Sequence, residues 1–134
     1  MADVTSWLQK VIGEAGAIAG TVHCLKGDTL ELVAAVNIPE KVQAITKTIP
    51  KGKGMAGLAW EREKPVQTCN LKDDNTGDVR PGAKAVDAAA AVALPLLDAN
   101  GGVWAVVGVA FKETRELPES EIERLRQLAA TLPQ

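Results

Sequence analysis

The chain has 134 residues, of which 46% are hydrophobic and 24% are charged, and its formal net charge is -2. This length fits a single domain, residues 1–134, with one core, and the composition is that of a globular protein. Because the basic residues are scattered and aromatic residues make up only 3% of the chain, neither charge nor base stacking favours a nucleic-acid partner.

The first segments predict a helix and a β-hairpin. Positions 4, 7, 8, 11 and 12 are apolar, which is the spacing of a helix that begins within residues 3–5 and ends at Gly13 or Gly16. Two apolar β-type runs follow, at residues 18–25 and 30–36, and the Gly-Asp step between them favours a tight hairpin. Residues 37–46 are too short and mixed to assign; a helical turn that leads into a short strand at 46–49 would fit them, and the segment stays open.

The segment IPKGKGMAGLAW, residues 49–60, has the G-x-G-x-x-G spacing of a dinucleotide-binding loop. That function needs a buried strand before the glycines, a helix of ten or more residues after them, and an acid at the end of the next strand. Here the short strand at 46–49 is stopped by Pro50, the helix covers residues 55–63, and the acidic pair that follows lies inside a loop. We therefore interpret the glycines as structural. The first two allow unusual backbone conformations, and Gly57 allows close packing of the helix on the sheet.

The second half of the chain predicts a strand, a long loop, a hairpin and a final helix. The strand starts at the Pro-Val step of KPVQTCNL, and residues 72–87 then form a loop of a length typical of binding loops. Two apolar runs, 90–97 and 103–111, predict a hairpin. The final helix has one apolar face, formed by Ile122, Leu125, Leu128, Ala129 and Leu132. The order of elements predicts an α+β domain built on an antiparallel sheet.

Targeting and membrane segments are not apparent in the sequence. The N-terminal MADVTSWLQK lacks a basic start followed by an apolar run, and the apolar run 88–97 contains Pro95 and is too short to span a bilayer. We expect a cytoplasmic protein that does not contact a membrane. In that compartment Cys24 and Cys69 are expected to be buried, free thiols. The four aromatic residues are expected to lie mostly in the core; they are Trp7, Trp60, Trp104 and Phe111.

The stretch IPKGKGMAGLAWEREKPVQTCNL resembles the core signature of the GAF domain, and the flanking segments agree with it. AGTVHCLKGDTLELVAAV matches the early hairpin, and a V-x-x-V-V-G-V strand leads into an acid-rich last helix. The resemblance implies an antiparallel sheet with the first and last helices packed together on one face. On the other face, the short helix and the long loop would cover a small-molecule pocket. Known ligands of the family include cyclic nucleotides, bilins, haem, oxoacids and amino-acid derivatives.

This chain lacks residues that several activities of the family require. Of the cyclic-nucleotide signature only Lys112 and one acid match. His23 and Cys24 are neighbours on a strand, so they point to opposite faces, and the sequence predicts no metal site. We expect His23 to be a partly exposed strand residue. Free methionine-R-sulfoxide reductases need a cysteine in the glycine turn or the pocket loop. Because neither segment contains one, only Cys69 is left as a candidate, and we expect no enzymatic activity.

The sequence supports two principal hypotheses. The first is a stand-alone sensory or regulatory module that binds a small anionic ligand, of unassigned identity, and signals to an unidentified protein partner. Backbone N–H groups near Met55 and Ala56 would bind the anion, assisted by the loop side chains Asp73, Thr76, Arg80 and Lys84. The alternative is a ligand-free module that forms a homodimer through its terminal helices, using Trp7, Leu8, Val11, Ile12, Leu125, Leu128 and Leu132. A degenerate free methionine-R-sulfoxide reductase is the third, least favoured hypothesis.

Overall fold

The computed structural model describes residues 4–68, 90–112 and 117–132. The described elements are, in chain order, α1 (Val4–Ala15), β1 (Ala19–Lys26), β2 (Thr29–Val36), α2 (Glu40–Thr46), β3 (Thr48–Pro50), α3 (Gly54–Arg62), β4 (Val66–Thr68), β5 (Ala90–Leu97), β6 (Val103–Phe111) and α4 (Glu119–Ala129).

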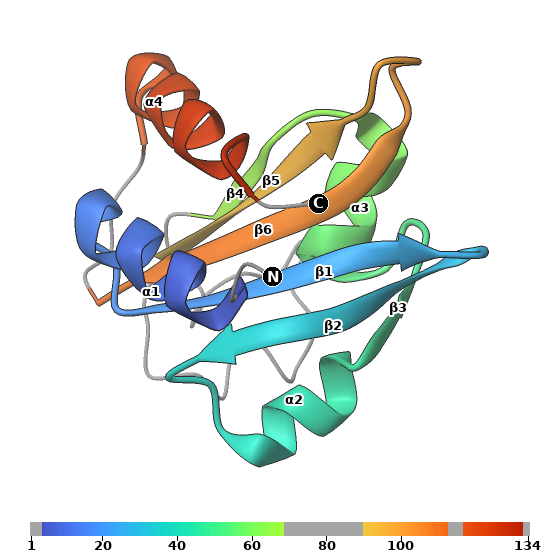
Figure 1. The fold of residues 1–134 in the computed structure, drawn as a ribbon, viewed down its shortest axis with the longest axis horizontal. Coiled ribbons are helices and arrows are strands. Elements are labelled where there is room, and N and C mark those ends of the chain that lie inside the picture. The colour runs from blue at the N-terminus through green and yellow to red at the C-terminus, as the bar shows by residue number, and fades with distance from the viewer. Residues whose placement is uncertain (1–3, 69–89, 113–116, 133–134) are drawn as a thin grey trace.

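The strands form one sheet in the order β3-β2-β1-β6-β5-β4, with every neighbouring pair antiparallel. Helices α1 and α4 lie together over one face of this sheet, and α3 lies on the opposite side (Figure 1). The fold is therefore the α+β, antiparallel arrangement that the sequence predicts, with the terminal helices on one face.

The face under α1 and α4 carries the larger core. Leu8 and Val11 of α1 and Leu125 of α4 pack there against strand residues such as Leu94 and Phe111. α1 is also joined to the segment that follows α4 by a hydrogen bond of 2.8 Å from Trp7 Nε1 to Thr131 Oγ1. Alternation along β5 explains this core, because its even-numbered residues, from 90 to 96, all point to the same face.

The apolar residues of the predicted dimer surface are mostly used inside this core. Leu8, Val11, Ile12, Leu125 and Leu132 are buried in the single chain, whereas Trp7 and Leu128 are partly buried. Their packing on the sheet accounts for the apolar stripes of both helices without a second copy. Dimerisation through these helices stays a prediction.

Two β-bulges interrupt the sheet. Val22 of β1 pairs with Ala34, but the next residue, His23, pairs with Leu32, so that Val33 is an extra residue on β2. The extra residue changes which face the following side chains meet: Leu30 packs on the α3 side, whereas Ala34 packs on the α1 side. A second register shift, between Leu96 and Leu97, leaves Trp104 as the extra residue on β6.

The glycine segment has the structural role that its sequence suggests. Gly52 and Gly54 have positive φ angles of 82° and 68°, which other residues rarely adopt. A Cβ atom on Gly57 would lie 2.6 Å from the carbonyl oxygen of Pro50, so only glycine lets α3 approach β3 this closely. The prediction that these glycines shape the backbone is confirmed.

Residues 37–46, which the sequence left open, contain a helix of seven residues, α2. Phe111 is buried, but the three tryptophans and Cys24 are only partly buried, less than we expected. Cys69 and the predicted loop 72–87 lie outside the described residues. Within the part of the chain that the structure describes, no helix combines the length and apolar character that crossing a membrane requires.

Candidate ligand-binding site

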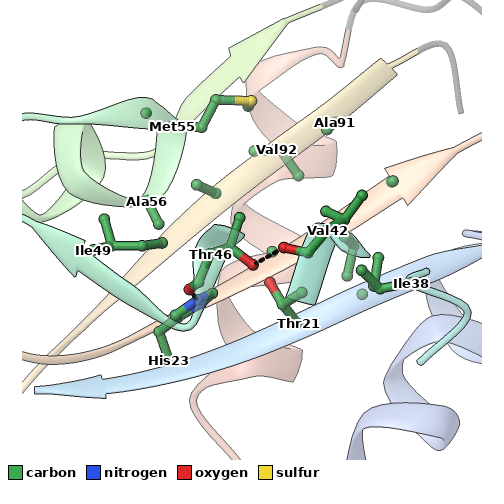
Figure 2. A pocket seen from close by; sticks show the side chains of 16 residues that line it. Thr21, His23, Ile38, Val42, Thr46, Ile49, Met55, Ala56, Ala91 and Val92 are labelled. Atoms are coloured by element: carbon green, nitrogen blue, oxygen red, sulfur yellow. Dashed lines mark hydrogen bonds between the residues drawn. The ribbon is translucent and has the colours of Figure 1, made fainter. Parts of the chain in front are cut away.

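A cavity of about 140 Å³ lies between the sheet and the segment that runs from α2 to the start of α3. Its floor is formed by the central strands, and its walls by Ile38, Val42, Ile49 and Met55 (Figure 2). The described lining is Gly20, Thr21, His23, Ile38, Val42, Thr46, Ile49, Gly54, Met55, Ala56, Ala91, Val92, Ala93, Gly108, Val109 and Ala110.

The cavity exists because the floor residues are small. Ala91 and Ala93 of β5 alternate with large residues that point to the other face, and Ala110 and Gly108 of β6 continue the same row. Gly108 pairs with Thr21 across the strands, and a Cβ atom at Gly108 would lie 3.0 Å from Thr21 Oγ1. Larger side chains at these positions would fill the space.

The polar side chains of the described lining are Thr21, His23 and Thr46, and no charged side chain is among them. Figure 2 shows Thr21 and His23 pointing from β1 toward α2. Thr46 ends α2 and donates a hydrogen bond of 2.9 Å from its Oγ1 to the carbonyl oxygen of Val42. The hydroxyl of Thr46 is therefore already engaged within its own helix.

His23 is buried and neutral, and its ring donates a hydrogen bond to the backbone. Only 3% of the residue is exposed, and its Nε2 lies 2.9 Å from the carbonyl oxygen of Thr46. A carbonyl oxygen can only accept, so Nε2 carries the proton and the neutral ring leaves Nδ1 as an acceptor. Burial lowers the pKa of His23, and the hydrogen bond to Thr46 opposes this shift in part. The ring is therefore neutral at pH 7.

Nδ1 of His23 has no hydrogen-bond partner. Among the described residues it is the one buried side-chain nitrogen or oxygen in this condition. A buried polar atom without a partner costs about 1–3 kcal/mol, and buried polar groups in native proteins are usually satisfied by protein, water or ligand. Because Nδ1 is buried even though the cavity is empty, a group in the cavity would not reach it in this conformation.

The start of α3 supplies hydrogen-bond donors to the same cavity. The first backbone N–H groups of a helix have no partner within that helix, and Lys53, the N-cap residue, provides no side-chain cap. Gly54, Met55 and Ala56 form this first turn and all line the cavity. These N–H groups and the helix dipole favour an anionic or carbonyl oxygen.

The structure brings only part of the predicted site together. Met55 and Ala56 line the cavity as expected, although their role in binding stays a prediction. Asp73, Thr76, Arg80 and Lys84 lie outside the described residues. Sequence reasoning missed Thr21, Thr46 and the cavity-facing role of His23.

The prediction that His23 is partly exposed is wrong, because α2 covers this part of β1 and its last residue, Thr46, bonds to the ring. The prediction that His23 and Cys24 face opposite ways is confirmed: His23 lines the cavity, whereas Cys24 packs against the core under α1 and α4. In residues 4–68, 90–112 and 117–132, no group of three or more histidine, cysteine, aspartate or glutamate residues could hold a metal ion.

A family model described as GAF domain matches residues 1–133. The chain belongs to the GAF domain family. Among solved structures it is similar to the GAF domain of Acinetobacter phosphoenolpyruvate-protein phosphotransferase, with a TM-score of 0.76 and 16% identity over 98% of this chain and 81% of that one. A comparison with curated proteins found no match.

Two further GAF-like structures differ in their described function. One is a type II free methionine-R-sulfoxide reductase from Thermoplasma acidophilum, with a TM-score of 0.73 and 15% identity over 97% of this chain and 94% of that one. The other is a domain of a proposed two-component sensor histidine kinase from Sinorhizobium meliloti 1021, with a TM-score of 0.71 and 17% identity over 95% and 83% of the two chains. At such identities the likeness establishes the fold, and function has to be argued from the site.

Proposed function

We propose that this GAF domain is a sensory or regulatory module that binds a small anionic molecule in the cavity between its sheet and helices α2 and α3. The observation that carries the proposal is the cavity of about 140 Å³, which the first turn of α3, Gly54 to Ala56, lines. Apolar walls with a few converging polar groups are typical of small-molecule sites. The anion would bind to the N–H groups of Met55 and Ala56, with Arg80 and Lys84 of the loop adding charge.

The regulatory part of the proposal is supported by the relatives and extends beyond them. A GAF domain of a phosphotransferase and a domain of a proposed sensor kinase have this fold. We propose that the present chain passes its binding event to a separate protein partner. α2 is suited to report occupancy, because it forms a wall of the cavity and is joined to β1 by the His23–Thr46 hydrogen bond.

The ligand can be sought by native mass spectrometry of protein purified from its host, followed by thermal shifts with small carboxylates and phosphates. A ligand at 100 times its dissociation constant should stabilise the fold by about 2.7 kcal/mol. We expect Ala91→Leu to abolish this shift, because Ala91 lines the cavity floor. Ala44→Leu is the matched control, since it adds the same bulk on the exposed side of α2. Equal shifts in both variants would place the ligand elsewhere.

The same proposal treats the chain as non-enzymatic. The glycine turn presents Met55 and Ala56 to the cavity and no thiol, and the loop 72–87 contains no cysteine. We expect no turnover of free methionine sulfoxide by the purified protein in the presence of a thiol reductant. Turnover that disappears in Cys69→Ser and persists in Cys24→Ser would contradict this expectation and favour a reductase.

A further inference from the structure

The hydroxyl of Thr21 lies on the floor of the cavity and restricts what the ligand can be. We propose that Thr21 determines ligand specificity, because its Oγ1 donates a hydrogen bond to an uncharged oxygen acceptor on an otherwise apolar part of the bound molecule. This inference rests on the proposed function and specifies the chemistry of the part of the ligand that the cavity encloses.

Thr21 carries the one side-chain hydrogen-bond donor of the described lining that the protein itself does not use. Thr46 donates its hydroxyl proton to the carbonyl oxygen of Val42, and Nε2 of His23 donates to the carbonyl oxygen of Thr46. Thr21 Oγ1 has no hydrogen bond to the described residues. It is not buried either, since His23 Nδ1 is the one buried side-chain nitrogen or oxygen among these residues that lacks a partner. The Thr21 hydroxyl is therefore accessible to a ligand.

The neighbours of Thr21 in the sheet leave its hydroxyl uncovered. Thr21 pairs with Ala35 of β2 on one side and with Gly108 of β6 on the other, so no large side chain lies directly beside it. A Cβ atom on Gly108 would lie 3.0 Å from Thr21 Oγ1, and Gly108 lines the cavity. Figure 2 shows the Thr21 side chain directed from β1 toward α2. Its hydroxyl thus lies over the floor and faces the enclosed space.

The rest of the described lining favours an uncharged, apolar body. Its side chains carry no charge, so a charged group enclosed there would lose its hydration without a partner of opposite charge. The anionic group of the proposed function would instead bind at the N–H groups of Met55 and Ala56. An acceptor beside Thr21 is therefore a carbonyl, ether or hydroxyl oxygen.

The volume limits the size of the enclosed part of the ligand. An apolar cavity of about 150 Å³ in another protein binds benzene, and the cavity here has about 140 Å³. The enclosed part is thus about the size of one six-membered ring. Together these features define a compact apolar body with one uncharged oxygen directed at Thr21.

Cyclohexanone and methylenecyclohexane provide a matched pair of probes, because they have nearly the same shape and only cyclohexanone carries a strong acceptor. NMR titration of the full-length protein measures both dissociation constants, and the methyl resonance of Thr21 reports whether a probe binds at this site. The quantity to compare between variants is the ratio of the two affinities. Differences in the hydration of the free probes cancel in that comparison.

Two substitutions at position 21 separate the hydroxyl from the methyl group. Thr21→Val replaces the hydroxyl by a methyl group of similar size, and valine is as well suited to a strand as threonine. We expect the ratio of cyclohexanone to methylenecyclohexane affinity to fall about two- to tenfold in this variant. Thr21→Ser, the matched control, loses the methyl group and keeps the hydroxyl, so its ratio should stay close to that of the parent protein.

The outcomes distinguish this inference from the proposed function. A ratio that Thr21→Val leaves unchanged, or that falls equally in Thr21→Ser, would overturn the role of Thr21 while retaining the cavity as a binding site. Failure of both probes to bind the parent protein in a saturable way would overturn this inference alone, because the thermal shifts with carboxylates and phosphates test the proposed function separately.

Discussion

The two faces of the sheet are built from the same strands but are filled differently. Under α1 and α4, large side chains such as Leu94, Val107 and Phe111 meet the helices and leave the face closely packed. Under α2 and α3, the intervening residues are mostly alanine and glycine, and a cavity opens above them. Because strand residues alternate between faces, the same strands carry a closely packed core on one face and a cavity on the other.

Truncation on the packed face should give the largest loss of stability. Leu94 of β5 is fully buried under α1 and α4, so we expect Leu94→Ala to lower the free energy of unfolding by about 2–5 kcal/mol. Urea denaturation measures the effect. Leu97→Ala, on the same strand but at a residue that is 42% exposed, serves as control. A similar loss in both variants would contradict the division between the faces.

Larger side chains should destabilise the packed face more than the face with the cavity. Ala105 of β6 is fully buried in the core under α1 and α4, so Ala105→Leu should cost about 1–3 kcal/mol through overpacking. Ala91→Leu makes the same change over the cavity and should cost clearly less. Parallel thermal and urea unfolding of the two variants tests the difference. If Ala91→Leu is equally destabilising, the space above β5 is not available to a ligand.

Acid should weaken the cavity face through His23. Because burial lowers the pKa of His23 below its ordinary value of 6.5, the unfolded chain takes up a proton that the folded chain resists. The contribution of His23 to stability is complete above the unfolded pKa and is lost as the pH falls through it toward the folded pKa. The slope from this one proton is at most about 1.4 kcal/mol per pH unit.

Urea denaturation at a series of pH values from about 7.5 to 5.5, on either side of the ordinary histidine pKa, would measure this loss. His23→Gln should remove most of the slope, because glutamine does not titrate and the other described residues that line the cavity carry no titratable group. An unchanged slope in this variant would show that the acid sensitivity arises elsewhere.

Local patterns were sufficient for most of the fold. The hairpin at Ala90–Leu97 and Val103–Phe111 was predicted with its bounds, because two long apolar runs flank a turn rich in glycine. The position of Met55 and Ala56 at the cavity also followed from a local signal, the glycine turn before α3. In these segments the structure follows from the local run of residues and the turn beside it.

Long-range contacts decided what the sequence did not show. α2 has only seven residues, too few for a helix to be stable alone in water, and it depends on the burial of Val42 and on the bond from His23 to Thr46. Because the sequence did not assign α2, the cover over His23 and hence its burial could not be anticipated. The cavity also depends on the distance of α2 and α3 from the strands that form its floor. The spacing of apolar residues in the sequence does not predict this distance.

The extra residue on β2 has a consequence for insertions and deletions in this strand. With Val33 in place, Leu30 serves one face and Ala34 the other, although four residues separate them, a spacing that would put both on one face of a regular strand. Deleting Val33, which is 44% exposed, would let Ala34 follow Leu32 directly, and regular alternation would keep Leu30 and Ala34 on their present, opposite faces. Loss of this one residue should therefore leave the side chains in the second half of β2 on their present faces.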